Sequence, residues 1–176
     1  MIELAIVAAK AAELRNAFDR ARAVPWGAAA VERIENLLAI RVSGDAFAIR
    51  LSEISGLATD RKIVAFPSPL SELLGLAAIR GRLIPVYSLA ALLGYTVNTG
   101  HGRWLALCGT EEPVGLALND FEGYLRVPLT QVFPAEKKDE SLHVKHVVHA
   151  ADGVRDIVSL PLLIEVIQRR CRNGER

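Results

Sequence analysis

The sequence predicts a mainly β protein made of two small barrels, with a helix at each end of the chain. Three observations support this: short alternating apolar segments fill the middle of the chain, one such pattern occurs twice, and both ends have the composition of helices. The 176 residues suffice for one domain or two small lobes. Because 51% of the residues are hydrophobic and 23% are charged, disorder is excluded for most of the chain.

The charge and the cysteines narrow the class of protein. The formal net charge is +1, whereas dedicated nucleic-acid binders usually carry a basic surplus, so we expect no nucleic-acid partner. Cys108 lies in an apolar run and Cys171 in a basic tail, far apart in the sequence. This spacing disfavours a disulfide framework or a thiolate metal site and suits a reducing compartment.

The N-terminal sequence does not fit a signal peptide, because it has an early acid, Glu3, and no basic segment before its apolar residues. No stretch of the chain reaches the roughly 18 to 20 apolar residues that a membrane-spanning helix needs. We therefore expect a soluble, cytoplasmic protein without direct membrane insertion.

The first predicted element is a helix over residues 2–22, which are rich in Ala, Glu, Leu and Arg and contain no Gly or Pro. Its apolar residues Ile2, Ile6, Leu14 and Phe18 fall on roughly one face, and Pro25-Trp26-Gly27 ends it. This helix either covers the core of its own domain or docks a partner. We expect residues 1–35 to form an N-terminal helical extension.

Short strands are predicted from residue 36 onward. Residues 38–42 and 47–51 flank Ser43-Gly44-Asp45, which is a hairpin signature. Phe47, Ile49 and Leu51 alternate with smaller or polar residues, so we expect all three side chains to face a core.

The next stretch predicts a loop, a second hairpin and a short helix. A loop at Pro67-Ser68-Pro69 leads into a helical turn over residues 70–74 that ends at Gly75. Strands over 76–79 and 83–86 flank a tight turn at Arg80-Gly81, and Pro85 argues for an edge position or a bulge because it cannot donate to a ladder. A helical turn over 89–93 is capped by Gly94.

The same pattern then recurs about 67 residues later. Residues 38–40, 47–51 and 54–57 align without a gap with 105–107, 114–118 and 121–124, apolar residue against apolar residue. Farther along, 85–89 resembles 156–160 at a slightly larger offset. Self-similarity of this kind predicts two similar units, each of about five short strands, that share one hydrophobic seam.

A helix over residues 161–170 closes the predicted fold, with Leu162, Leu163, Val166 and Ile167 turned inward. Three arginines near its end, Arg169, Arg170 and Arg172, suit the helix dipole. We interpret them as a solvated helix end and not as a nucleic-acid patch.

No constellation of residues in the sequence predicts catalysis or metal binding. His143, His146 and His149 lie on a predicted strand, where their spacing of three places them on opposite faces, so we expect rim histidines and no metal site. His101 lacks a neighbouring acid and nucleophile, and no phosphate loop, dinucleotide fingerprint or nucleophile elbow is present. We expect a protein that is not an enzyme, binds no cofactor and works by presenting surfaces.

One segment resembles the CheW family of chemotaxis coupling proteins. It runs from Phe66-Pro67-Ser68-Pro69 through Leu74-Gly75, Ile79-Arg80-Gly81 and Ile84-Pro85-Val86 to Leu93-Gly94. The resemblance extends over about residues 36–168. It implies two interleaved five-stranded barrels within a domain at 36–170, with lobes at about 36–94 and 95–170 and a tail at 171–176.

The resemblance also implies a function. Members of this family are non-enzymatic adaptors that couple the cytoplasmic tips of chemoreceptors to the regulatory domain of a CheA-type histidine kinase. Their paired lobes can associate end to end with this homologous domain, so that alternating partners close into rings. The adaptor is then recruited to the membrane face through receptor arrays.

The candidate contact surface centres on Arg80 and Gly81, because an arginine fork suits bidentate pairing with a partner carboxylate. The other interpretation of Arg80 is an internal ion pair that holds the lobes together. Further candidate partner-binding residues are Ile54, Gly56, Leu57, Phe66, Leu74 and Gly75.

Departures from the family pattern point to a specialised array that serves chemotaxis or a related pilus, gliding or development pathway. Gly56 stands where the family often has an acid, and Leu118-Asn119 stands for the usual Val-Asp pair. The alternative function is a β-barrel module that binds a small ligand or a nucleic acid.

Overall fold

The structure is a computed structural model that describes residues 33–96, 102–109, 112–135 and 143–174. The chain divides into two units, residues 1–33 and 34–176, and the described elements all belong to the second unit. The predicted helix over residues 2–22 and the loop histidine His101 lie outside the described residues.

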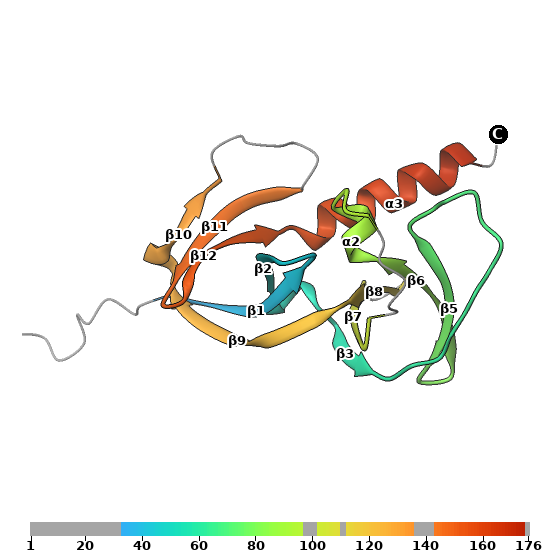
Figure 1. Cartoon of the computed structure of the whole chain (residues 1–176), viewed down its shortest axis with the longest axis horizontal. Coiled ribbons are helices and arrows are strands. Elements are labelled where there is room, and N and C mark those ends of the chain that lie inside the picture. Colours follow the sequence, from blue (N-terminus) through green and yellow to red (C-terminus); the bar gives the residue numbers. More distant parts are fainter. Residues whose placement is uncertain (1–32, 97–101, 110–111, 136–142, 175–176) are drawn as a thin grey trace, which may run out of the picture. The chain divides into compact units, whose positions relative to one another are not determined.

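The second unit contains two six-stranded sheets (Figure 1). The mainly β class is confirmed, and each sheet has one strand more than predicted. In order along the chain the elements are β1 (Ile34–Val42), β2 (Asp45–Arg50), η1 (Leu51–Glu53), β3 (Gly56–Thr59), β4 (Ile63–Val64), β5 (Leu73–Ile79), β6 (Arg82–Ser88), α2 (Leu89–Leu92), β7 (Trp104–Cys108), β8 (Val114–Leu118), β9 (Asp120–Pro128), η2 (Leu129–Gln131), β10 (Val132–Pro134), β11 (Val144–Ala150), β12 (Gly153–Val158) and α3 (Leu160–Gly174).

The strand order shows that the two lobes exchange strands. Sheet A has the order β10-β11-β12-β2-β1-β9, and sheet B has the order β3-β7-β8-β6-β5-β4. Strand β3 follows the β1–β2 hairpin in the chain but pairs with β7, whereas β9 follows the β7–β8 hairpin but pairs with β1. Each hairpin therefore gives its third strand to the opposite sheet, which is the interleaving that the resemblance implies.

The internal repeat predicted from the sequence is confirmed by the pairing register. The hairpin β1–β2 corresponds to β7–β8, and the two parallel pairs, β12 with β2 and β6 with β8, correspond as well. Ile157 opposes Ala48 in sheet A, and Val86 opposes Gly115 in sheet B. The helix that follows is α3 in one half and α2 in the other.

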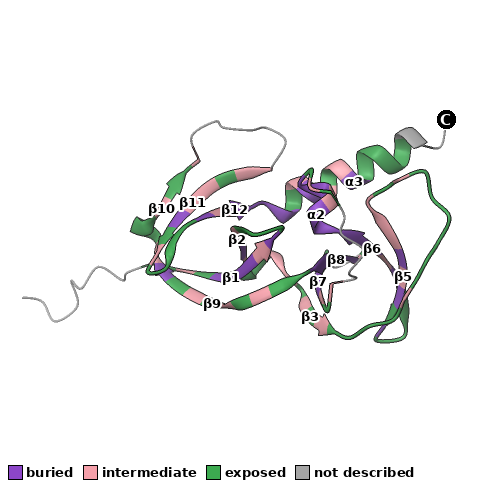
Figure 2. Cartoon of the chain, viewed as in Figure 1, coloured by how far each residue is buried: buried purple, intermediate pink, exposed green. Residues whose placement is uncertain are grey.

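The buried hydrophobic residues form three clusters. The ribbon of Figure 2 is purple wherever a residue is buried. Sheet A curls around a small core that includes Leu37, Val148 and Ile157. Sheet B does the same around a core that includes Leu105 and Ile84. The largest cluster draws on both sheets and on both helices, so it is the shared seam that the repeat predicts.

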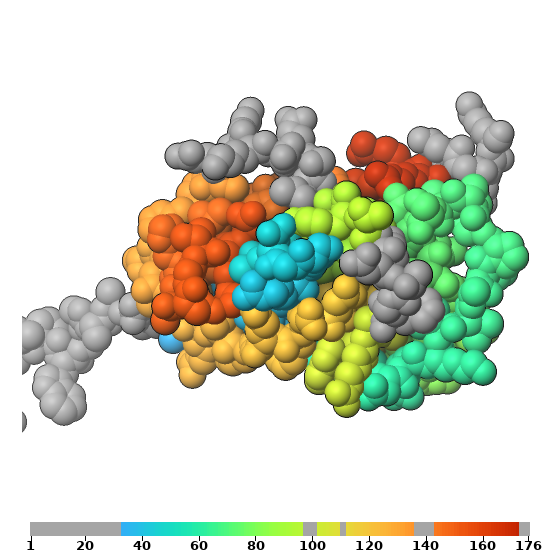
Figure 3. All heavy atoms as spheres, in the orientation of Figure 1, coloured from blue at the N-terminus to red at the C-terminus, as the bar shows by residue number. Residues whose placement is uncertain are grey.

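A polar contact also joins the two halves beside this seam. The Tyr95 hydroxyl, just after α2, donates a hydrogen bond to Asp45 Oδ2 at 2.6 Å, and its ring meets Phe47 edge-on. Desolvation and this hydrogen bond raise the pKa of Tyr95 to about 12. In the space-filling view the β1–β2 turn accordingly lies at the surface between α2 and the β11–β12 strands (Figure 3).

Both predicted hairpin turns are confirmed, with backbones that suit the twist of the strands. Ser43 and Gly44 have φ values of +51° and +98°, and Arg80 and Gly81 have +50° and +77°. Positive φ at both central residues is typical of a type I′ turn. The helical turn after β6 is also confirmed, because Ser88 Oγ caps α2 by accepting from the Ala91 N–H at 3.2 Å.

Two local predictions are wrong. Leu51 is 39% exposed instead of facing a core, because the chain leaves β2 at Arg50 and the η1 turn breaks the alternation. Residues 70–74 do not form a helical turn that ends at Gly75. Strand β5 begins at Leu73, and Gly75 lies inside it at a bulge with φ +145°.

Pro85 was predicted to lie at an edge or a bulge, and β6 is not an edge strand, although Pro85 itself is paired on one side only. Strand β6 is an interior strand of sheet B, between β8 and β5. The pairing of β6 with β8 begins only at Val86, so Pro85 lies where β6 has one neighbour. A missing donor costs little at such a position.

The predicted C-terminal helix is confirmed as α3, and it is longer than predicted. Leu163 and Ile167 are buried in the seam. Glu53, in η1, accepts a hydrogen bond from the Leu160 N–H at 2.8 Å and so caps the start of α3. None of the helices in the described ranges is long and apolar enough to cross a membrane.

Candidate functional site

The tip of the β5–β6 hairpin carries the central predicted residue, Arg80. Four non-glycine residues in the described part of the chain have a positive φ: Ser43, Asp60, Arg80 and His143. Arg80 is the one whose long side chain and residue type are least suited to the left-handed region. Strained backbone of this kind clusters at functional sites, which makes the hairpin tip a candidate contact site.

The Arg80 guanidinium lies beside strand β3. A Cβ atom built on Gly56 would be 3.7 Å from Nη2 of Arg80 and 3.5 Å from Cδ1 of Leu107, both ordinary contact distances. Gly56 therefore leaves open the position from which a side chain would meet the guanidinium. Arg80 itself is exposed.

No acid compensates this guanidinium within residues 33–96, 102–109, 112–135 and 143–174, where Arg80 makes no ion pair. An internal pair that joins the lobes is thus not formed with any described carboxylate. Arg80 is therefore a candidate for pairing with a carboxylate of a partner.

A shallow pocket of about 270 Å³ adjoins Arg80. Its wall includes Ser55, Leu107 and Pro113. The Ser55 N–H and hydroxyl both donate to the Leu107 carbonyl oxygen, at 2.7 and 3.0 Å, and so fasten the start of β3 to β7. The surface beside Arg80 is therefore held by backbone contacts between strands that are far apart in the sequence.

Of the other predicted residues, Gly81 shares the turn with Arg80. Leu57 follows Gly56 on β3 and is 39% exposed, but adjacent side chains of a strand point to opposite faces, so it lies on the face away from the guanidinium. Phe66 is 56% exposed on the segment between β4 and β5. Leu57 and Phe66 present apolar area that a partner can cover.

The remaining predicted residues are used inside the fold. Ile54 packs against the seam, and Leu74 packs against the core of sheet B. Gly75 allows β5 to approach β4, because a Cβ at this position would overlap the carbonyl oxygen of Val64. This close approach gives Gly75 a structural role, whatever its contribution to a contact surface.

Leu83 and Val154, which are 73% and 56% exposed, are among the exposed apolar residues that the sequence did not mark as contact residues. Leu83 is the second residue of β6, and Val154 is the second residue of β12. The two strands are equivalent in the internal repeat, so each half presents an apolar side chain beside a hairpin tip, Leu83 at the β5–β6 hairpin and Val154 at the β11–β12 hairpin. Extending the alignment of 85–89 with 156–160 by two residues would have paired them.

An ion-pair network that the sequence did not predict lies at the equivalent end of sheet A. Arg155 is 4% exposed, and its guanidinium pairs with Glu122 at 2.6 Å and with Asp152. Arg41 contacts the same Glu122 at 2.8 Å. Hydrogen bonds from the two arginines lower the pKa of Glu122, and the bond from Arg155 lowers the pKa of Asp152. The network fixes the β11–β12 turn against β9.

The three strand histidines do not converge on a metal site. His146 and His149 lie on β11, whereas His143 precedes it, and burial lowers the pKa of His143 and His146. In the described ranges no group of three His, Cys, Asp or Glu side chains is placed to hold a metal ion. Cys108 and Cys171 are free thiols, and burial raises the pKa of Cys108 to about 12.

Comparison with known proteins identifies the family and the fold of the chain. The sequence matches the model of the CheW-like domain family over residues 36–168. The fold is similar to the crystal structure of the scaffolding protein TtCheW from Thermoanaerobacter tengcongensis, with a TM-score of 0.67 at 15% identity. This likeness covers 74% of the present chain and 92% of the other. No curated protein sequence matches the chain.

Proposed function

Because the chain belongs to the CheW-like family, whose members are chemotaxis coupling scaffolds, we propose that it couples chemoreceptor tips to a CheA-type histidine kinase. In this role it acts as an adaptor and not as an enzyme. It is held at the cytoplasmic face of the membrane by the receptors that it binds. The pathway that the array serves is chemotaxis or a related motility or development response.

The Arg80 guanidinium, which has no ion-pair partner among the described residues, is the observation that carries this proposal. The guanidinium lies on a strained turn, beside an apolar strand surface, with no acid opposite it in the described part of the chain. A partner carboxylate can form two parallel hydrogen bonds with it, a contact that adds geometric specificity as well as affinity. Gly81 supplies backbone surface beside this contact, and Leu107 supplies apolar surface.

The repeat supports contacts at both ends of the adaptor. Leu83 and Val154 are exposed at equivalent positions of the two lobes, although the charged residue at the tip differs. A homologous regulatory domain that has the same two ends can cover one of these side chains with each lobe. Head-to-tail association of this kind closes into a ring when the rotation between neighbours allows it.

The test is to replace Arg80 with Ala and to measure binding of the full chain to a receptor-tip fragment and to the kinase regulatory domain. The matched control is Arg126→Ala, because Arg126 is exposed on β9 in the other sheet. Loss of a charge-assisted pair predicts a fall in affinity of about tenfold or more for one partner. A folded Arg80→Ala variant with both affinities unchanged would remove Arg80 from the contact surface.

A further inference from the structure

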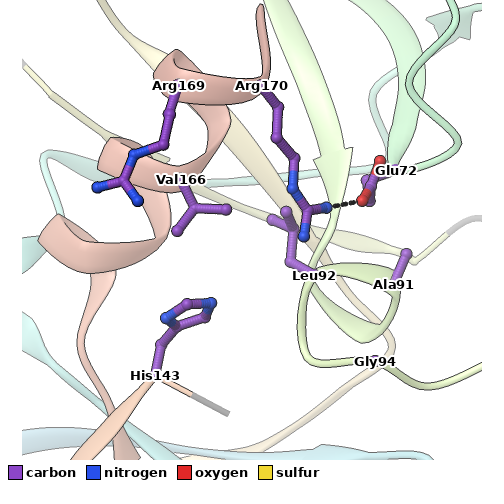
Figure 4. A pocket seen from close by; sticks show the side chains of 8 residues that line it. All are labelled: Glu72, Ala91, Leu92, Gly94, His143, Val166, Arg169 and Arg170. Carbon is purple, nitrogen blue, oxygen red and sulfur yellow. Dashed lines mark hydrogen bonds and ion pairs between the residues drawn. The ribbon is translucent and has the colours of Figure 1, made fainter. Parts of the chain in front are cut away.

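A second pocket, of about 430 Å³, lies where α3 passes α2 and the start of β11 (Figure 4). Its walls come from both halves of the repeat: α3 and His143 belong to the half built around β11 and β12, and α2 and Glu72 belong to the half built around β5 and β6. Its lining residues are Glu72, Ala91, Leu92, Gly94, His143, Val166, Arg169 and Arg170.

Positive charge exceeds negative charge on these walls. Arg170 forms an ion pair with Glu72, as the dashed line in Figure 4 shows. Arg169, one residue earlier on the helix, has no ion-pair partner in the part of the chain that the structure describes. Among the described residues, one guanidinium in the pocket therefore has no counter-charge.

His143 faces the same space from a different segment (Figure 4). Its backbone is held at φ +50°, and its carbonyl oxygen accepts a hydrogen bond from the Ser159 N–H at 3.1 Å, immediately before α3. The backbone at His143 is thereby held beside the start of the helix that carries both arginines. Burial lowers the pKa of His143 below its ordinary value, so near pH 7 the ring is neutral and adds a hydrogen-bonding group without adding charge.

We propose that this pocket binds an organic carboxylate with an apolar body. The carboxylate pairs with the Arg169 guanidinium and receives a hydrogen bond from His143, while Ala91, Leu92 and Val166 contact the apolar body. Its volume falls in the range of small-molecule sites and exceeds what an inorganic anion fills. A single uncompensated guanidinium matches a monoanion better than a dianion, because Glu72 already neutralises Arg170.

The carboxylate can belong to a free organic acid or to the C-terminus of a peptide, because both present the same group beside an apolar side chain. In either case the ligand touches α3 from one half of the repeat and α2 from the other. Binding therefore stabilises one arrangement of the two helices across the seam.

Isotope-edited NMR titration of the full chain tests the proposal, with benzoate as the probe and benzamide as its neutral control. We expect benzoate, and not benzamide, to shift the signals of Ala91, His143 and Val166. Arg169→Gln should weaken benzoate binding by about tenfold, as expected for loss of a charge-assisted pair, whereas Arg172→Gln on the same helix should not. Equal shifts with benzoate and benzamide, shifts that map elsewhere, or an unaffected Arg169→Gln variant would each overturn the proposal.

The pH dependence provides a second readout, because a bound carboxylate favours the imidazolium form of His143. Within the described ranges, the charged groups that line the pocket with this ring are Glu72, Arg169 and Arg170, and α2 contributes none. Benzoate affinity should rise between pH 7.5 and 5.5, and His143→Gln should abolish the rise while keeping the binding. A rise that persists in His143→Gln would contradict the assigned role of this residue.

A short peptide that ends in phenylalanine, compared with its C-terminal amide, identifies the source of the carboxylate. Tighter binding of the acid peptide than of benzoate identifies a chain terminus, and weaker binding identifies a free acid. Equal binding of the acid peptide and its amide, together with no response to benzoate, would remove the carboxylate from the proposal altogether.

Discussion

Restoring an acid beside Arg80 should weaken partner binding. In Gly56→Asp the new Cβ would lie 3.7 Å from Arg80 Nη2, so a carboxylate one bond farther on comes within hydrogen-bond reach of the guanidinium. Gly56→Asn places a neutral side chain of the same size there, so the two variants differ only in charge.

The magnitude follows from the exposure of the pair. Exposed ion pairs contribute about 0.2–1 kcal/mol to stability. The free energy of unfolding of G56D should therefore exceed that of G56N by up to about 1 kcal/mol. A partner carboxylate must displace this internal ion pair to reach Arg80, and it is also repelled by the carboxylate introduced at position 56. One kcal/mol corresponds to a roughly fivefold change in the dissociation constant, so we expect G56D to bind each partner about three- to tenfold more weakly than G56N.

Isothermal titration calorimetry with the receptor-tip fragment and with the kinase regulatory domain, at low and high salt, measures the difference. The gap between G56D and G56N should narrow as salt screens the carboxylate. Equal affinities for both partners, or tighter binding by G56D, would refute the view that Arg80 receives a carboxylate from outside the chain.

Three further predictions concern the folded chain. Arg80→Gly should relieve the strain of the positive φ and leave the free energy of unfolding unchanged or raised by up to about 1 kcal/mol, while partner binding weakens as in Arg80→Ala; a large destabilisation in urea would show that the side chain has a structural role. Gly75→Ala should destabilise the fold by at least about 2 kcal/mol, because its Cβ would overlap a backbone carbonyl, whereas Gly123→Ala, which meets nothing within 4 Å, should be nearly neutral in the same denaturation assay. Stability should fall with acid, because the pKa of Glu122 is lowered in the folded state: its contribution is complete above the ordinary value near 4.5 and is lost as the pH falls through the lowered value. Urea midpoints measured from pH 6 to 3 should show this loss, and the loss should be smaller in Arg155→Leu. An identical pH profile in Arg155→Leu would show that the ion pairs of Arg155 do not cause the loss of stability in acid.

The hairpins and the repeat could be predicted from the sequence because their signals are local. Alternating apolar residues around Ser43-Gly44 and Arg80-Gly81 specify strands and tight turns, and the recurrence of this pattern specifies two similar lobes. No local feature of the sequence shows which sheet the third strand of each lobe joins. Whether β3 pairs within its own lobe or with β7 depends on long-range packing, which the periodicity of one strand does not reveal.

The errors arose where tertiary contacts override a local pattern. Leu51 continues the alternation of β2, but the chain turns at η1 and carries it outward. Gly75 resembles a helix cap, but its positive φ serves a bulge that brings β5 close to Val64. The ion pairs of the buried Arg155 could not be predicted, because Glu122 lies on β9 and Asp152 lies in the β11–β12 turn. In the sequence these residues are only isolated charges.

The candidate site was predictable only in part, for the same reason. The tight turn at Arg80 and Gly81 can be recognised in the sequence, but the position of the guanidinium beside Gly56 depends on the exchanged strand β3. Leu83 looks like an ordinary core residue of an alternating strand, and only its exposure in the folded lobe marks it as available to a partner.

Sedimentation velocity on a mixture of the full chain, a receptor-tip fragment and the kinase regulatory domain tests the adaptor role most directly. An adaptor should give a sedimentation boundary that contains all three components, that disappears when the chain is omitted and that is weakened by Arg80→Ala but not by Arg126→Ala. A chain that sediments alone in the presence of both partners would contradict it.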